Sequence, residues 1–205
     1  MPYHLTVDAN LINHEIVLTF QSVKTLFGSE FETVGAPFNM NTIARFKGVK
    51  GKSWAYAVKA GDVLKDTINL DDFDDEIYDL TVNGPNGFYR NFAGSKKNPS
   101  IIVKVYPEHT GLINKKLTGK LVFAVENTGT SLVTLQILDN KYKSGSQTVN
   151  IRPKSNANIS FNLAKNANWY DFSMVQKGNP TFKHRYAGKI ETGEITQTDP
   201  YMGNV

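Results

Sequence analysis

Short stretches of alternating apolar and polar residues recur along the chain. In residues 121–125 the side chains of Leu121, Phe123 and Val125 fall on one face, and residues 133–137 alternate in the same way. Successive side chains of a strand point to opposite faces, so a period of two predicts a strand with one buried face. Turns rich in Gly, Asn and Pro separate the stretches, with no helical pattern between them. The pattern therefore predicts an all-β protein with antiparallel strands.

The predicted strands cover both halves of the chain. We expect them at residues 5–8, 15–20, 36–41, 54–58, 63–70, 101–106, 120–126, 133–137, 149–151 and 159–163. Pro37 would confine its strand to a sheet edge or a bulge, because proline cannot donate to a ladder. A polar, basic loop is expected around Gly48 and Gly51. The turns at residues 60–62 and 153–155 each predict a hairpin between the strands that flank them.

One stretch of the sequence occurs twice. Residues 78–94, the first signature, and residues 170–188, the second signature, each open with Tyr-Asp, turn at Gly, Asn and Pro, and close with Ala-Gly. The copies are shifted by 92 residues at the Tyr-Asp pairs and by 94 at the Ala-Gly pairs. Residues 57–70 align with residues 150–163 at a shift of 93. Spacing this constant across three segments favours a duplication.

The duplication predicts two tandem antiparallel β-sandwich domains of the immunoglobulin-like class, at residues 1–97 and 98–205. The polar segment 95–100 follows a completed hairpin and marks the boundary. In immunoglobulin-like folds, a tyrosine hydroxyl near a strand start bonds back to the preceding loop. We expect Tyr78 and Tyr170 to make this bond.

Charge and composition narrow the function classes. The chain of 205 residues has a net charge of +4, and its Lys and Arg residues are scattered singly, which favours a solvated mixed surface over a nucleic-acid partner. It has no cysteine, hence no disulfide and no thiolate chemistry. No apolar run approaches the roughly 18 residues of a membrane span. The strand pattern begins right after Met1 without a signal peptide, so we expect a piece of a longer protein or one that stays inside the cell.

Residues suited to catalysis or metal binding do not converge along the sequence. The histidines His4, His14, His109 and His184 lie far apart, and none has a His or carboxylate partner at metal-ligand spacing. Residues 84–87, Gly-Pro-Asn-Gly, lie between strands and are typical of a turn, not of a phosphate loop. No serine stands in a Gly-x-Ser-x-Gly elbow. We therefore predict no catalytic residue, no cofactor and no metal.

The acidic run at residues 71–76 leaves two interpretations open. Its clustered carboxylates suit Ca²⁺, but it lacks the glycine and the spacing of a calcium loop, and Phe73 interrupts it. A run of like charge is also typical of a solvated surface.

A second pair of interpretations concerns the long loops of the first half. Leu26, Phe27 and Phe31 are apolar residues in an expected loop, and Arg45 and Lys47 are basic residues in the next one. Apolar tips beside cations would contact a lipid headgroup surface or a partner. Alternatively, the three apolar residues cap the sandwich core, since exposed apolar clusters are uncommon.

The doubled signature resembles the C-terminal domain of bacterial phospholipases C of the non-haemolytic and haemolytic types, which occurs there in tandem. In the first signature the resemblance is carried by Tyr78, Asp79, Gly84, Pro85, Asn86, Gly87, Phe88, Arg90, Phe92 and Gly94. In the second signature it is carried by Tyr170, Asp171, Gly178, Arg185 and Gly188. We regard all fifteen as structural signature residues.

The resemblance implies chemistry that lies outside this chain. Enzymes of this family cleave phosphatidylcholine to diacylglycerol and phosphocholine, with nucleophile and metal ligands in an N-terminal catalytic domain. The chain would then be a non-catalytic region of a secreted or periplasmic phospholipase C. Its partner would be that catalytic domain, with a phospholipid surface as a further option. The alternative is an independent carbohydrate- or lipid-surface-binding module, which an exposed aromatic row would favour.

Overall fold

The computed structural model describes residues 3–23, 35–111, 116–192 and 197–201. Its strands are β1 (Leu5–Ile12), β2 (Glu15–Ser22), β3 (Ala36–Phe46), β4 (Val49–Val58), β5 (Val63–Asn69), β6 (Ile77–Asn83), β7 (Tyr89–Ser95), β8 (Ile101–Thr110), β9 (Lys116–Asn127), β10 (Val133–Asp139), β11 (Gln147–Ile151), β12 (Asn156–Asn162), β13 (Trp169–Gln176) and β14 (Asn179–Lys189). Short 3-10 turns are η2 (Leu70–Asp72), η3 (Asp74–Glu76), η4 (Pro85–Gly87) and η5 (Ala164–Asn166). In the described part of the chain, no helix is long and apolar enough to span a membrane.

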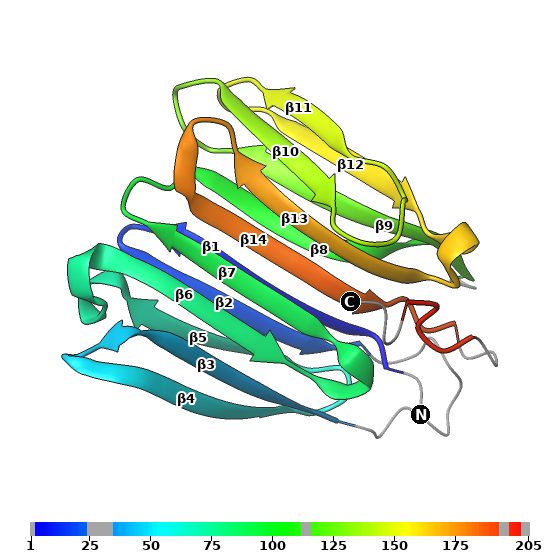
Figure 1. The fold of residues 1–205 in the computed structure, drawn as a ribbon, viewed down its shortest axis with the longest axis horizontal. Coiled ribbons are helices and arrows are strands. Elements are labelled where there is room, and N and C mark those ends of the chain that lie inside the picture. Colours follow the sequence, from blue (N-terminus) through cyan, green and yellow to red (C-terminus); the bar gives the residue numbers. More distant parts are fainter. Residues whose placement is uncertain (1–2, 24–34, 112–115, 193–196, 202–205) are drawn as a thin grey trace.

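The strands form two layers (Figure 1). One layer is an eight-stranded sheet in the order β11-β10-β13-β14-β7-β6-β3-β4, and the other holds the sheets β1-β2-β5 and β12-β9-β8. All pairs are antiparallel, which confirms the all-β antiparallel prediction. The first seven strands and the last seven pair in the same order, so we call them the first and second repeats.

The repeats are joined in both layers. In the eight-stranded sheet, β7 pairs with β14, with Asn91 opposite Arg185 at the middle of the ladder. In the other layer, side chains of β1 bind the backbone of β8. Asn10 Oδ1 accepts from the Val103 amide at 2.8 Å, and Asp8 Oδ1 accepts from the Val105 amide at 3.1 Å. A single sheet and a side-chain seam therefore run through both repeats.

The core lies between the two layers and follows the alternation seen in the sequence. Phe20 of β2 packs on Phe38 of β3 with ring centroids 5.4 Å apart, and Phe123 of β9 packs on Phe172 of β13 at 5.8 Å. All four are fully buried. Burying a phenylalanine stabilises a fold by roughly 1.5–3 kcal/mol. Phe123 also contacts Tyr186 of β14 at 5.3 Å, so the core continues to the join between the repeats.

The two predicted hairpins are wrong. β4 pairs with β3 and β5 with β2, so the turn at residues 60–62 crosses between layers. The turn at residues 153–155 does the same, because β11 pairs with β10 and β12 with β9. The reason is core packing: Ile68 of β5 and Phe161 of β12 extend the buried faces of the three-stranded sheets. Alternation identifies a strand but does not identify its partner.

The structure of the first repeat differs from two further expectations. The basic segment around Gly48 is not a loop but a hairpin of β3 and β4, with Lys47 and Gly48 at positive φ in its turn. β3 is an internal strand although it contains Pro37. Its ladder with β6 covers only Asn39–Thr42, so Pro37 lies beyond the region where its missing N–H would be needed.

Candidate functional site

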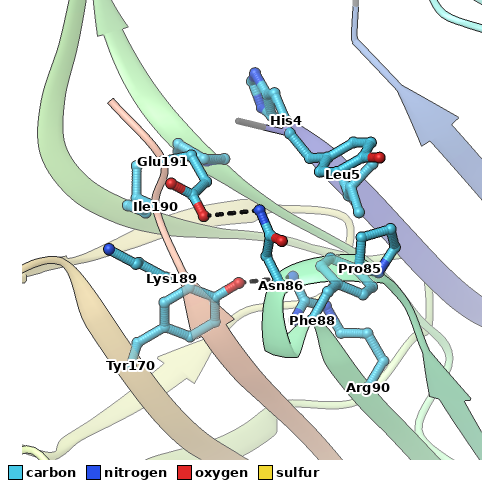
Figure 2. Close-up of a pocket in the computed structure, with 12 residues that line it drawn as sticks. His4, Leu5, Pro85, Asn86, Phe88, Arg90, Tyr170, Lys189, Ile190 and Glu191 are labelled. Atoms are coloured by element: carbon cyan, nitrogen blue, oxygen red, sulfur yellow. Dashed lines mark hydrogen bonds between the residues drawn. The ribbon is translucent and has the colours of Figure 1, made fainter. Parts of the chain in front are cut away.

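The two signatures lie side by side where the repeats join. The first consists of β6, the turn η4 and β7, and the second of β13 and β14, which confirms the predicted strand–turn–strand form of each. β7 pairs with β14, so the signatures share one ladder. Figure 2 shows their meeting point, where Asn86, Phe88 and Arg90 of the first signature lie next to Tyr170 of the second and Glu191 just beyond it.

Arg90, a charged residue that is only 2% exposed, lies where the two signatures meet. Its Nη1 donates to the carbonyl oxygens of Tyr89, at 2.8 Å, and of Ala187, at 3.0 Å. Its Nη2 donates to the Tyr170 hydroxyl oxygen at 3.0 Å. A buried charge is costly without such partners. Arg90 thus bonds β7 of the first repeat to both signature strands of the second.

Aromatic rings surround the same guanidinium group. The Arg90 Cζ lies 4.0 Å from the ring centroid of Phe88, 5.3 Å from that of Tyr186 and 5.6 Å from that of Tyr170. Cation–π attraction of this kind contributes about 2 kcal/mol when the cation is desolvated. The signature residues Phe88 and Tyr170 therefore pack against the buried charge.

Each signature places its first tyrosine opposite its last glycine. Tyr78 pairs with Gly94 across β6 and β7, and Tyr170 pairs with Gly188 across β13 and β14. A Cβ atom on Gly188 would lie 3.3 Å from the Tyr170 hydroxyl oxygen, tighter than ordinary contact. Gly188 thus leaves room for the Tyr170 ring, whereas a Cβ atom on Gly94 would meet the Asn98 side chain that binds the Tyr78 hydroxyl.

The tyrosine hydroxyls do not bond back to the preceding loops, so that expectation is wrong. The Tyr78 hydroxyl accepts from Asn98 Nδ2 at 2.9 Å, and the Tyr170 hydroxyl accepts from Arg90. The Tyr170 ring lies against Gly188 of the returning strand, and its hydroxyl reaches Arg90 of the first repeat. Burial raises the pKa of Tyr78 to about 12, which keeps its hydroxyl protonated at neutral pH.

A row of polar side chains crosses the outer face of the four central strands. Asn91 Nδ2 donates to Asp79 Oδ1, and Arg185 donates from Nε and Nη2 to the two carboxylate oxygens of Asp171, at 2.8 and 2.6 Å. Burial alone would raise the pKa of Asp171, but hydrogen bonds from Arg185 and Asn140 hold it below its usual value. These polar signature residues therefore bind neighbouring strands to each other.

The signatures enclose a cavity of only about 30 Å³, lined in part by Pro85, Asn86, Phe88, Arg90 and Tyr170 (Figure 2). A cavity needs roughly 10–15 Å³ to hold one water molecule. This cavity therefore has room for water and is far smaller than ligand pockets, which measure roughly 300–1,000 Å³.

A wider groove lies next to this cavity. It has a volume of about 370 Å³, and its walls include Asn86, Gly87, Trp169, Lys189 and Glu191. Asn86 Nδ2 donates to Glu191 Oε1 at 3.2 Å, and the Lys189 ammonium lies 5.4 Å from the centroid of the Trp169 ring. An aromatic ring beside amide and charged groups is a lining that orients a small polar ligand.

Comparison with protein families identifies the doubled unit. The family described as bacterial phospholipase C, C-terminal domain, matches residues 1–95 and again residues 103–189. The chain belongs to this family. The two matches fall on the two repeats, and the expected resemblance is confirmed.

Three relatives place this phospholipase C C-terminal chain among longer proteins. It is 34% identical over 149 residues to a non-hemolytic phospholipase C of Pseudomonas aeruginosa, covering 72% of this chain and 21% of the relative. The non-hemolytic phospholipase C of Burkholderia pseudomallei is 31% identical over 179 residues, 82% of this chain and 23% of its own. The hemolytic phospholipase C of Pseudomonas aeruginosa is 26% identical over 158 residues, which cover 73% of this chain and 21% of the relative. The chain spans about a fifth of each relative.

The basic hairpin and the acidic run of this phospholipase C C-terminal chain form ion pairs with each other. Arg45 Nε donates to Asp74 Oδ2 at 2.8 Å, and Lys47 Nζ lies 3.1 Å from Asp72 Oδ2. The basic hairpin and the acidic run thus partly neutralise each other. Three apolar residues expected to act with Arg45 and Lys47 lie outside the described residues: Leu26, Phe27 and Phe31.

One polar convergence was not found from the sequence. His14 Nε2 lies 2.9 Å from Asp71 Oδ1 and 3.0 Å from Glu76 Oε1. His14 and Asp71 are 57 residues apart, so no spacing rule along the chain connects them. The ladder of β2 with β5 brings them together by setting Glu15 opposite Asn69. The sequence shows His14 just before an expected strand and an acidic run at residues 71–76, but it does not show the strand pairing that joins them.

Proposed function

We propose that the chain is the non-catalytic C-terminal region of a secreted or periplasmic phospholipase C that hydrolyses phosphatidylcholine. Its two repeats, at residues 1–97 and 98–205, are tandem immunoglobulin-like sandwich domains. They act as one rigid support for the N-terminal catalytic domain of the same parent chain, and the region also contacts phospholipid.

The observation that carries this proposal is the position of the signature residues, several of which lie in the contact between the two repeats. Arg90 and Tyr170 bond one repeat to the other, next to a cavity of about 30 Å³. A catalytic site would need a nucleophile or an acid–base pair next to space for substrate. Family membership together with coverage of only about a fifth of each relative supports chemistry in another part of the parent protein.

Lipid contact is proposed for the hairpin of β3 and β4. Ile43 and Val49 on this hairpin are 76% and 65% exposed, next to Arg45 and Lys47. Exposed apolar residues beside cations suit the boundary of headgroups and acyl chains. Because Arg45 and Lys47 already bind acidic residues, the apolar side chains would supply most of the affinity.

Two measurements on the purified chain test these roles. We expect no hydrolysis of phosphatidylcholine or of a chromogenic phosphocholine ester, and hydrolysis would overturn the non-catalytic assignment. We expect co-sedimentation with phosphatidylcholine vesicles that survives high salt and is weakened by Ile43→Ser with Val49→Ser. Binding restricted to anionic vesicles and lost in salt would indicate non-specific charge attraction. Absence of binding would leave support of the catalytic domain as the role.

The second candidate is an independent module that binds carbohydrate or a lipid surface, and the groove at Trp169 favours it. The groove is about 370 Å³ in volume and combines this ring with Asn86 and Glu191. Binding of a polysaccharide or a glycan panel that Trp169→Ala abolishes would establish this function. A chain that binds no glycan, yet restores stability to a separately expressed catalytic domain, would favour the first proposal.

A further inference from the structure

Three metal-ligating side chains from separate segments converge on the first repeat. His14 lies in the turn between β1 and β2, Asp71 lies in η2, and Glu76 ends η3. One ligand atom from each lies within 4.8 Å of the other two. We propose that these three residues bind a first-row divalent transition-metal ion, for which Zn²⁺ is the probe.

The arrangement of atoms points to a cation at the centre. His14 Nε2 is 2.9 Å from Asp71 Oδ1 and 3.0 Å from Glu76 Oε1. A ring nitrogen carries at most one hydrogen, so it cannot donate a well-aligned bond to both carboxylates. If Nε2 carries no hydrogen, three lone pairs face each other. A metal ion would bind all three and remove this conflict.

The two distances at His14 Nε2 fit such an ion with little movement, and the Asp71 and Glu76 ligand oxygens lie within 4.8 Å of each other. Zinc binds imidazole nitrogen and carboxylate oxygen at about 2.0–2.2 Å, which sets ligand atoms of a tetrahedral site roughly 3.3 Å apart. The two distances at His14 Nε2 need to lengthen by only a few tenths of an ångström. Calcium takes six to eight oxygen ligands, so the imidazole favours zinc and its neighbours.

The backbone holds the ligands in place without a metal. The Leu70 amide donates to the His14 carbonyl oxygen at 3.0 Å, which fixes the histidine turn beside Asp71. Phe73, between Asp71 and Glu76, is 2% exposed and anchors the acidic run in the core. The Glu76 amide donates to the Phe73 carbonyl oxygen at 3.1 Å. The apolar residue that interrupts the acidic run therefore positions the carboxylates on either side of it.

Lys96 and solvent surround the three ligand side chains. Lys96 Nζ binds Glu76 Oε2, which leaves Oε1 turned toward His14, as a partner that orients a ligating carboxylate does. The side chains of His14 and Asp71 are 44% and 65% exposed, so water can fill the remaining coordination positions. The site would join the turn between β1 and β2 to the segment that leads into the first signature.

The test is a zinc titration of the full 205-residue chain, free of any affinity tag, by isothermal calorimetry. We expect saturable binding of one ion per chain and a zinc-dependent rise in melting temperature. His14→Asn keeps the left-handed turn that His14 adopts, at φ 69°, and removes the imidazole. His14→Asn and Glu76→Gln should each weaken zinc binding by roughly tenfold or more.

The matched control is Asp75→Asn. It removes one charge from the same acidic run, but its carboxylate is not one of the three ligands. Its zinc affinity should stay within about threefold of the wild type, since a neighbouring exposed charge acts only through screened attraction. The proposal is overturned if the wild type shows no saturable binding, or if Asp75→Asn weakens it as much as His14→Asn does. Circular dichroism of the metal-free variants checks that each is folded.

Discussion

Arg90 carries the most specific residue-scale expectation, because its guanidinium bonds two strands of the other repeat. Arg90→Met keeps the length of the side chain but leaves the Ala187 carbonyl and the Tyr170 hydroxyl without their donors. Losing partners of buried polar groups costs about 1–3 kcal/mol for each. We expect the free energy of unfolding, measured in urea, to fall by roughly 3 kcal/mol.

Tyr170→Phe is the matched variant for Arg90→Met. It removes only the hydroxyl that accepts from Arg90 Nη2, so we expect a smaller loss, of about 1.5–2 kcal/mol. An Arg90→Met chain as stable as the wild type would show that the buried charge does not hold the two signatures together. The sequence marked both residues as signature positions, yet their contact spans the two copies. Aligning one copy on the other cannot reveal a contact between them.

Gly94 gives a second residue-scale prediction. A Cβ atom there would lie 2.8 Å from Asn98 Cγ, closer than real Cβ contacts come. The Asn98 side chain cannot yield freely, since it bonds the Ser95 amide at 2.8 Å and the Tyr78 hydroxyl at 2.9 Å. We expect Gly94→Ala to lower the free energy of unfolding by roughly 1–3 kcal/mol.

A double-mutant cycle isolates the cause of that loss. With Asn98→Ala already present, the three atoms nearest to the added methyl group are gone, so Gly94→Ala should cost clearly less in this background. Additive costs in the cycle would place the strain somewhere other than Asn98.

At the scale of elements, strand positions follow from the sequence far better than strand partners do. Alternation at residues 133–137 and 121–125 identified β10 and β9, because a period of two reflects one buried face. The same signal at β11 and β12 gave a false hairpin, since each strand pairs within a different layer. The seam between β1 and β8 could not be anticipated either, because side chains replace its backbone ladder.

The seam of β1 and β8 predicts a pH effect through Asp8. Burial raises the pKa of Asp8 to about 7, against about 3.9 in an unfolded chain. Between these values the folded chain keeps a proton that the unfolded chain loses, so the stability due to Asp8 falls as pH rises from about 4 to 7. Asp8→Asn keeps the acceptor for the Val105 amide. It should gain stability relative to wild type over this range, by on the order of 1–3 kcal/mol.

Urea unfolding at several pH values between 4 and 8 measures this difference. His184 acts in the opposite direction, because burial lowers its pKa to about 3 and the stability due to it is lost as pH falls below about 6.5. Comparing Asp8→Asn with wild type at each pH cancels that contribution. Asp62→Asn, in the exposed turn before β5, is the control. A stability difference for Asp8→Asn that does not change with pH would contradict the prediction.

At the scale of the whole molecule, the shared sheet makes the repeats mutually dependent. Duplication predicted two sandwich units, and the repeated strand order fits that plan, but β7 and β14 are internal strands of one eight-stranded sheet. We therefore expect the 205-residue chain to unfold in one cooperative transition. Fluorescence, circular dichroism and calorimetry should then report the same midpoint. Two separate transitions would show that each repeat is stable without the other.

The first repeat alone provides the sharper test. A chain of residues 1–97 exposes the edge of β7, and an uncovered edge strand templates pairing with another chain. In the full chain β7 and β14 pair about Asn91 and Arg185, which are equivalent positions of the two signatures. Two copies of the first repeat can form the same antiparallel ladder with Asn91 opposite Asn91. We expect light scattering to report a dimer that Phe92→Lys, which places a charge in the shared core, converts to monomer or unfolds. A stable, folded monomer of residues 1–97 would show that the β7 edge needs no partner.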